Sequence, residues 1–238
     1  MKGHIHSFES LATLEGSGVR YGVFLQGCPL RCVYCHNPDT QRGGGEEYTP
    51  EVLVNKIVRY KPYFKTNGGV TFSGGEPLCQ SEFIKECIPL LRQKEISYVI
   101  DTSGAVKLDE AVKEVLRNSQ MVILDLKFWD NESYLRYTGQ DMTNTLEVLR
   151  FLDDEDIPVW VRTVVIPGIN DTEEIVEKYI PYIKAHKCIK KYELLAFHTM
   201  GFHKYEALGM ENPLADTPDL EKSIKERLQD FVDKKLNI

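Results

Sequence analysis

The sequence predicts an α/β fold in which parallel strands form a partial (β/α)6 barrel. Apolar runs rich in β-branched and aromatic residues alternate with segments of helical period, a pattern typical of β-loop-α units around a parallel sheet. We count six such runs with five connecting helices. The 238 residues are fewer than the ~250 typical of a complete eight-fold barrel. We therefore expect one domain over residues 1–238, built around a single core.

The expected strands are short apolar runs, and they cover residues 21–26, 70–72, 98–100, 121–126, 159–166 and 192–196. The expected connecting helices cover residues 50–65, 81–94, 108–118, 143–153 and 172–185, with a last amphipathic helix over 220–236. Thr49 before Pro50, and Asp171 before Thr172 and two glutamates, are typical helix-start signals. Residues 42–46 and 201–218 are predicted loops.

Charge and hydropathy exclude two classes of partner. The net charge of −7 and the absence of a Lys/Arg-rich block argue against binding to nucleic acid. No apolar run approaches the ~20 residues of a membrane-spanning helix. The first residues carry no apolar export signal, so we expect a cytoplasmic protein. We also expect it to act as a monomer.

Three of the six cysteines, Cys28, Cys32 and Cys35, lie within eight residues, separated by three and then two residues. This spacing lets one tight loop direct the thiols at a common centre, and thiolates bind zinc or iron-sulfur clusters. A structural zinc site normally takes four ligands from paired motifs, and clusters that only carry electrons usually take four cysteines. Three thiolates on a four-iron cluster would leave one iron open for chemistry.

Two other interpretations of these cysteines stay open. His36 could complete a zinc site, although its adjacency to Cys35 makes simultaneous ligation awkward, or the cysteines could be unrelated buried residues. The remaining cysteines, Cys79, Cys87 and Cys188, are scattered along the chain. We interpret these three as small buried hydrophobes.

The motif Cys28-x-x-x-Cys32-x-Tyr34-Cys35 resembles that of the radical S-adenosylmethionine superfamily. The similarity runs from residues 5–10 through residues 194–198. Within the superfamily, the sequence most closely resembles the family of pyruvate formate-lyase activating enzymes. It implies a partial barrel and a 4Fe-4S cluster whose fourth iron chelates the amino and carboxylate groups of S-adenosylmethionine. Related activases often carry a cysteine-rich insert after the motif, whereas residues 36–70 contain no cysteine here.

Gly74, Gly75 and Glu76 follow the second predicted strand. Glycines allow a ligand to approach the backbone, and a carboxylate can accept hydrogen bonds from an ammonium group. An ordinary turn explains the three residues better when they are taken alone. The resemblance implies that they form the site for the amino group of S-adenosylmethionine.

Asp125 and Lys127 flank Leu126 at the end of the fourth predicted strand, so alternation sends both charges to one face. Buried charges are costly unless a ligand or partner satisfies them. The resemblance implies that all three residues help to hold S-adenosylmethionine. Asp101 and Thr102 could join Asp125 in binding a monovalent cation, or could simply cap their strand.

The resemblance implies further contacts with S-adenosylmethionine. His198, after the sixth predicted strand, is a predicted ligand contact, while an isolated histidine is often structural. Contacts with the adenine are implied for Tyr34, Cys35 and His36.

The implied reaction belongs to anaerobic glucose metabolism. A reductant such as flavodoxin or ferredoxin reduces the cluster, which cleaves S-adenosylmethionine to a 5′-deoxyadenosyl radical, and that radical takes hydrogen from a glycine of pyruvate formate-lyase. Glu15 and Arg162 are candidate partner contacts. Glu15 stands where the family commonly has aspartate, which puts its contact in question, and Arg162 could instead form a structural ion pair.

Three alternative functions remain on the sequence alone. The chain could activate another glycyl radical enzyme, or could direct its radical at a small molecule. It could also be an electron carrier or a structural metal protein, a class that reductive cleavage of S-adenosylmethionine would exclude.

Overall fold

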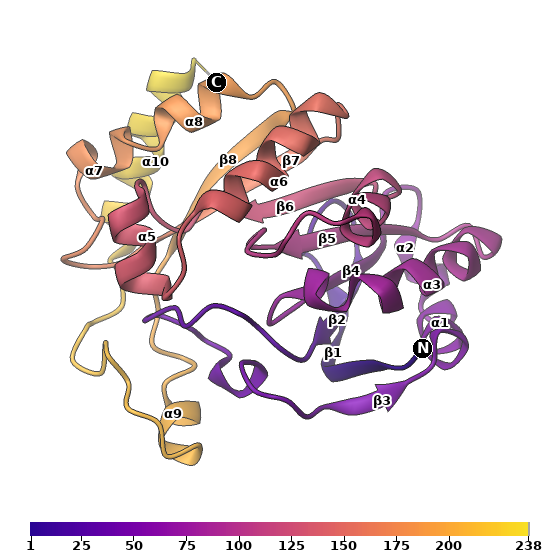
Figure 1. The fold of residues 1–238 in the computed structure, drawn as a ribbon. Helices are drawn as coiled ribbons and strands as arrows, with labels where there is room; N and C mark the ends of the chain where they lie inside the picture. The colour runs from indigo at the N-terminus through magenta and orange to yellow at the C-terminus, as the bar shows by residue number, and fades with distance from the viewer. Residues whose placement is uncertain (238) are drawn as a thin grey trace.

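The computed structural model describes residues 1–237, which fold around one eight-stranded sheet with the order β3-β1-β2-β4-β5-β6-β7-β8 (Figure 1). The strands are β1 (Gly3–Ala12), β2 (Arg20–Leu25), β3 (Glu46–Tyr48), β4 (Gly69–Gly74), β5 (Ser97–Thr102), β6 (Met121–Asp125), β7 (Val159–Val165) and β8 (Ile189–Ala196). Six of these strands run parallel, as the sequence predicts, namely β2, β4, β5, β6, β7 and β8. Because β3 and β8 form the two edges, the barrel is partial.

Strands β1 and β3 were not predicted, and both pair antiparallel. β1 lies between β2 and β3 in the sheet, and its sequence mixes histidines, serines and glutamate with only a few apolar residues. β1 therefore lacks the apolar run that marks the central strands. A strand beside a short edge strand of three residues need not be apolar on both faces.

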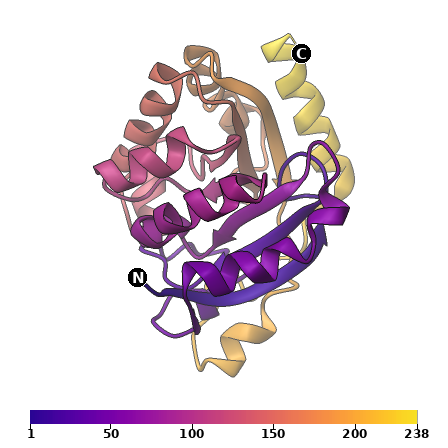
Figure 2. The ribbon, with the colours of Figure 1, turned by 90° about the vertical axis from the view of Figure 1, so that its right-hand side faces the viewer.

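Helices other than α9 cover the outer face of the curved sheet, which Figure 2 shows from the side. The helices of the described chain are α1 (Pro50–Val58), α2 (Lys61–Phe64), α3 (Ser81–Gln93), α4 (Glu110–Arg117), α5 (Asn131–Thr138), α6 (Thr143–Asp154), α7 (Glu173–Glu177), α8 (Ile180–Ala185), α9 (His203–Ala207) and α10 (Lys222–Leu236), with single turns η1 (Pro38–Thr40) and η2 (Pro77–Gln80). Among the described residues no helix has the length and apolar character needed to cross a membrane.

Two predicted helices are each divided in two. Pro62 follows the break between α1 and α2, and Pro181 follows the break between α7 and α8. Proline has no N–H to donate to the preceding turn, so each segment restarts at the proline.

Helices α5 and α9 were not predicted. α5 has clear end signals, because the Asp130 side chain accepts from the Ser133 N–H and Gly139 adopts the left-handed conformation at φ 78°. α9 has only five residues and lies within the predicted loop 201–218.

The main core lies between the sheet and the outer helices, where residues such as Val70 and Phe72 are fully buried. A second, smaller cluster of Val99, Met121 and Ile123 packs with Trp160. Strand alternation places these residues on the inner face of the barrel. These four residues form an apolar layer in the interior toward the amino ends of the strands, whereas many polar side chains lie at the carboxyl ends.

A fully buried arginine fixes the loop between β1 and β2 to the amino end of the barrel. The Arg20 side chain donates to the hydroxyl of Thr71 at 2.8 Å, to the carbonyl of Val70 at 2.9 Å and to the carbonyl of Ser17 at 3.0 Å. All of these acceptors are uncharged, and burial lowers the pKa of Arg20 to about 10. Removing the guanidinium would leave several buried acceptors without a partner.

We expect Arg20→Met to lower the free energy of unfolding by about 3 kcal/mol, because unsatisfied buried polar groups each cost ~1–3 kcal/mol. Chemical denaturation followed by circular dichroism measures this loss. Arg117→Met is the matched control, since its ion pair with Glu155 is solvent-exposed and should contribute little. Equal denaturation midpoints for the two variants would contradict the role given to Arg20.

Candidate active site

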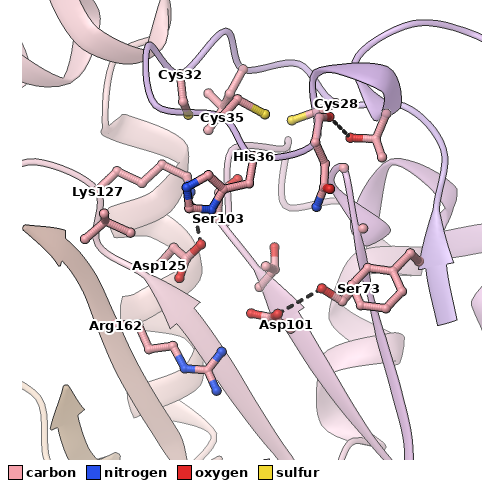
Figure 3. A pocket seen from close by; sticks show the side chains of 18 of the residues that line it. Cys28, Cys32, Cys35, His36, Ser73, Asp101, Ser103, Asp125, Lys127 and Arg162 are labelled. Atoms are coloured by element: carbon pink, nitrogen blue, oxygen red, sulfur yellow. Dashed lines mark hydrogen bonds and ion pairs between the residues drawn. The ribbon is translucent and has the colours of Figure 1, made fainter. Parts of the chain in front are cut away.

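A cavity of about 270 Å³ opens at the carboxyl ends of the parallel strands, where open α/β sheets bind their ligands (Figure 3). Its wall combines the cysteine loop after β2 with the ends of four neighbouring strands. The lining residues used below are Glu15, Cys28, Cys32, Tyr34, Cys35, His36, Ser73, Gly74, Gly75, Asp101, Thr102, Ser103, Asp125, Lys127 and Arg162. Most of the predicted site residues therefore come together.

The three thiols of Cys28, Cys32 and Cys35 are free and lie along one side of the cavity (Figure 3). Burial raises the pKa of Cys28 to about 11 and that of Cys32 to about 12. Without a metal these two thiols are neutral, so binding a metal group would have to displace their protons. Three free thiols on one wall fit a 4Fe-4S cluster, which Cys28, Cys32 and Cys35 would hold.

A zinc site completed by His36 is not formed. Within residues 1–237 no group of three or more His, Cys, Asp or Glu side chains is placed to hold a single metal ion. The Nε2 of His36 instead lies 2.8 Å from the carbonyl oxygen of His198, and the two imidazole rings stack with centroids 3.9 Å apart. Burial and the neighbouring His198 lower the pKa of His36.

Of the other three cysteines, Cys87 and Cys188 are buried as predicted. Cys79 is exposed, so its interpretation as a buried hydrophobe was wrong. It lies in the turn η2, which places its side chain outside the apolar core.

Glu76 is fully buried, and four internal hydrogen bonds occupy its carboxylate. Oε1 accepts from the hydroxyl of Thr102 at 2.5 Å and the N–H of Leu78 at 3.1 Å, while Oε2 accepts from the hydroxyl and the N–H of Ser103 at 2.5 and 2.9 Å. These bonds use the acceptor capacity of a carboxylate. Of this motif, Gly74 and Gly75 line the cavity, while the Glu76 carboxylate is bound within the chain. The contact of Glu76 with the amino group of S-adenosylmethionine stays a prediction.

Asp125 and Lys127 point into the cavity as alternation predicts, and Lys127 Nζ lies 3.0 Å from Asp125 Oδ2. Burial alone would lower the pKa of Lys127, but Asp125 and Tyr34 hold it well above its usual value. Leu126, between them, has its side chain fully buried in the core, and its contact with S-adenosylmethionine stays a prediction. The N–H of Leu126 donates to the main-chain carbonyl of Arg162, and the carbonyl of Leu126 accepts from the hydroxyl of Thr163.

Asp101 and Ser73 both line the cavity, and the hydroxyl of Ser73 donates to Asp101 Oδ2 at 2.8 Å (Figure 3). The pKa of Asp101 is raised by burial and by the nearby Asp125. The hydroxyl of Thr102 donates to Glu76 and accepts from the N–H of Gly104, which leaves it one lone pair. This part of the cavity therefore concentrates negative charge.

Three buried side-chain atoms have no hydrogen-bond partner within the described chain, namely Glu15 Oε2, Arg162 Nε and His198 Nδ1. Glu15 and Arg162 line the cavity, and His198 stacks on the cavity residue His36. Burial and Asp101 raise the pKa of Glu15 to about 8. Because buried polar groups are almost always paired, these atoms indicate that a ligand or partner completes the site.

The sequence interpretation missed Ser73 and Ser103, which lie at the ends of β4 and β5. Ser73 holds Asp101, and Ser103 holds Glu76. Their position at the carboxyl ends of parallel strands was the available signal, but serine is too common there to be selected without the fold.

A family model described as the radical SAM superfamily matches residues 23–179 of the chain. The chain is 39% identical over 232 residues to the pyruvate formate-lyase-activating enzyme of Clostridium pasteurianum, covering 97% of both chains. It is also 39% identical over 235 residues to the protein of that name from Staphylococcus epidermidis, covering 95% of this chain and 94% of the relative.

Solved structures share the fold. A domain of the pyruvate-formate lyase-activating enzyme from Bacteroides vulgatus matches with a TM-score of 0.58 at 22% identity, over 71% of this chain and 94% of that one. Streptococcus suis SuiB bound to S-adenosylmethionine matches with a TM-score of 0.66 at 17% identity, over 88% of this chain and 45% of that one. The chain belongs to the radical SAM superfamily and, within it, to the family of pyruvate formate-lyase-activating enzymes.

Proposed function

We propose that this protein activates pyruvate formate-lyase by generating a glycyl radical on it. The observation that carries the proposal is a single cavity with three free thiols on one wall and the charged pair Asp125–Lys127 on another. Relatives that bear the activating-enzyme name along the whole chain identify the protein substrate. A 4Fe-4S cluster with bound S-adenosylmethionine would supply the radical chemistry there.

The residues of the chain bind and orient these groups. Cys28, Cys32 and Cys35 would hold the cluster, since they are the thiols that line the cavity. Asp125 and Lys127 present one charge of each sign, which matches the ammonium and the carboxylate of an amino acid. The main chain at Gly75 lies beside Cys28, close enough to contact a group held there, and Gly74 lines the same cavity.

The adenosine part of S-adenosylmethionine has a separate set of contacts. Tyr34 offers a ring that lies 5.7 Å from Lys127 Nζ, and the main chain of Cys35 and His36 continues along the same wall. The stacked pair of His36 and His198 closes this side, and the unpaired Nδ1 of His198 can donate to or accept from the ligand.

Glu15 and Arg162 would receive the loop of the protein substrate. Arg162 is 8% exposed and donates to the carbonyl of Leu14, which ties the β1–β2 loop to β7. Its Nε lies 3.9 Å from Glu193 Oε2, an ion pair without a hydrogen bond, and remains a donor. The Oε2 of Glu15 has no hydrogen-bond partner and is an acceptor, or a second donor when protonated. An incoming main-chain segment carries both complementary groups.

Asp101 and Asp125 would share a monovalent cation, which would offset the repulsion between two carboxylates. We further propose that the protein is a cytoplasmic monomer of one domain, reduced by flavodoxin or ferredoxin, and that no nucleic acid or membrane takes part. The continuous main core, to which every parallel strand contributes, supports the single domain.

We expect anaerobically reconstituted protein to bind about four irons, because three thiolates and one external ligand complete a cubane. Cys28→Ala, Cys32→Ala and Cys35→Ala should each lose the brown absorbance and most of the iron. As controls, Cys79→Ala, Cys87→Ala and Cys188→Ala should keep it. Equal iron loss in a control variant would overturn the assignment of ligands.

Lys127→Ala should keep the iron but bind S-adenosylmethionine more weakly, by ~1.5–3 kcal/mol, because one charge-assisted hydrogen bond is removed. Isothermal titration calorimetry on the reconstituted protein measures this loss. Lys178→Ala is a suitable control, since its ammonium lies over Trp129 and does not line the cavity. Unchanged affinity in Lys127→Ala would remove this residue from the site.

Reduced protein with S-adenosylmethionine should produce a glycyl radical in pyruvate formate-lyase, seen by electron paramagnetic resonance as a doublet split by the remaining α-hydrogen. Replacing the target glycine of pyruvate formate-lyase with alanine should abolish the signal, because the planar radical depends on a residue without Cβ crowding. Cleavage of S-adenosylmethionine without the doublet, accompanied by modification of a small molecule, would show that the proposed substrate is wrong.

A further inference from the structure

The chain makes a closed excursion after β8. Residues 199–219 leave the barrel and return to the same place, because the Thr199 N–H donates to Asp219 Oδ1 at 2.7 Å and the Leu220 N–H donates to the Phe197 carbonyl at 2.9 Å. The excursion carries α9, which Figure 1 shows apart from the sheet and its covering helices. We call residues 199–209 the α9 segment.

The α9 segment packs on the residues that follow the third cysteine. The Tyr205 hydroxyl donates to the carbonyl of Cys35 at 2.9 Å. Gly201 lies so close to His36 that a Cβ on it would come within 2.6 Å of the His36 carbonyl oxygen. One segment thus touches a predicted cluster ligand and its neighbour without lining the cavity itself.

Lys204 forms the other part of this contact. Its ammonium donates to Asn37 Oδ1 at 2.8 Å and lies 3.0 Å from Asp39 Oδ2. His6 Nε2 on β1 lies 2.9 Å from the same Asp39 oxygen, and the Gln26 amide donates to the Asp39 carbonyl at 2.7 Å. Asp39 therefore joins α9, β1 and the end of β2.

The charge state of Asp39 favours this arrangement. Burial acts to raise the pKa of Asp39, but the ammonium of Lys204 and the imidazole of His6 outweigh it, so that the pKa lies below its usual value. The side chains of Lys204 and Asp39 are 26% and 28% exposed, so water screens this pair less than a pair on the open surface.

The two limbs of the cysteine loop are held differently. The first limb is fixed by main-chain bonds to α5, from the Arg31 N–H to the Thr138 carbonyl at 2.7 Å and from the Val33 N–H to the Tyr137 carbonyl at 3.0 Å. The second limb, residues 35–39, depends largely on side chains. Among them, the side chains of Lys204 and Tyr205 can be replaced without altering the cavity wall, because neither lines it.

We propose that Lys204 and Tyr205 are positioning residues for the reaction, holding residues 35–39 so that Cys35 and His36 keep the places they need to bind the cluster and S-adenosylmethionine. This inference rests on the proposed function for its kinetic consequence, but the clamp itself is a property of the chain alone.

The test compares Lys204→Met and Tyr205→Phe with the parent protein. In reconstituted protein each variant should keep its iron. The KM for S-adenosylmethionine should rise about tenfold, with a smaller change in kcat. Lys204→Met loses charge-assisted contacts, and Tyr205→Phe loses the part-buried hydrogen bond to Cys35. Lys204→Arg should restore the KM, since it keeps the positive charge near Asp39. Lys113→Met is the control, because it removes an ion pair to Glu110 at 2.7 Å far from the site.

Amide hydrogen exchange on the protein without iron gives an independent readout. The N–H groups of Thr40 and Gln41 close the turn after the loop by donating to the carbonyls of Asn37 and Pro38 at 2.9 and 3.2 Å. Both should exchange faster in Lys204→Met and Tyr205→Phe than in Lys113→Met.

Exchange and KM that match the control would overturn the proposal, as would a KM change that Lys204→Arg fails to reverse. If the parent protein takes up no iron, the proposed function fails, and the exchange measurement still decides whether the clamp exists.

Discussion

The site depends on one buried carboxylate, that of Glu76. Its oxygens bind the loop after β5 through Thr102 and Ser103 and the start of η2 through Leu78. Its own N–H donates to the carbonyl of Gly27 at 2.8 Å, directly before the first cysteine. Three loops that are distant in sequence are thereby held at one end of the barrel. A carboxylate in this position is tolerated because every lone pair finds a donor.

Around this anchor the cavity collects charges that the chain leaves incompletely paired. Glu15 and Arg162 each keep one buried atom without a partner, and Asp101 faces Asp125. A protein without a ligand gains nothing from such an arrangement, since unpaired buried polar groups are costly. The same features would become favourable with the cofactor, cation and peptide segment that we propose.

The apolar end of the barrel and the α9 segment complete the description of the site. Val99, Met121, Ile123 and Trp160 pack the interior near the amino end, where the buried Arg20 also lies, and the cavity opens at the carboxyl end. The second limb of the cysteine loop is held from outside by Lys204 and Tyr205. Rigid support of the groups that bind a cofactor is what keeps a reactive species in a productive geometry.

The sequence by itself determined the alternating α/β pattern, the six parallel strands and the three-cysteine motif, because hydrophobic period and ligand spacing are local properties. It missed β1, β3, α5 and α9. Only the tertiary structure showed that Thr102 and Ser103 occupy the Glu76 carboxylate and that Leu126 faces the core. Those outcomes depend on which loops meet in space, and hydrogen-bond partners 26 residues or more apart leave no periodic signal in the chain.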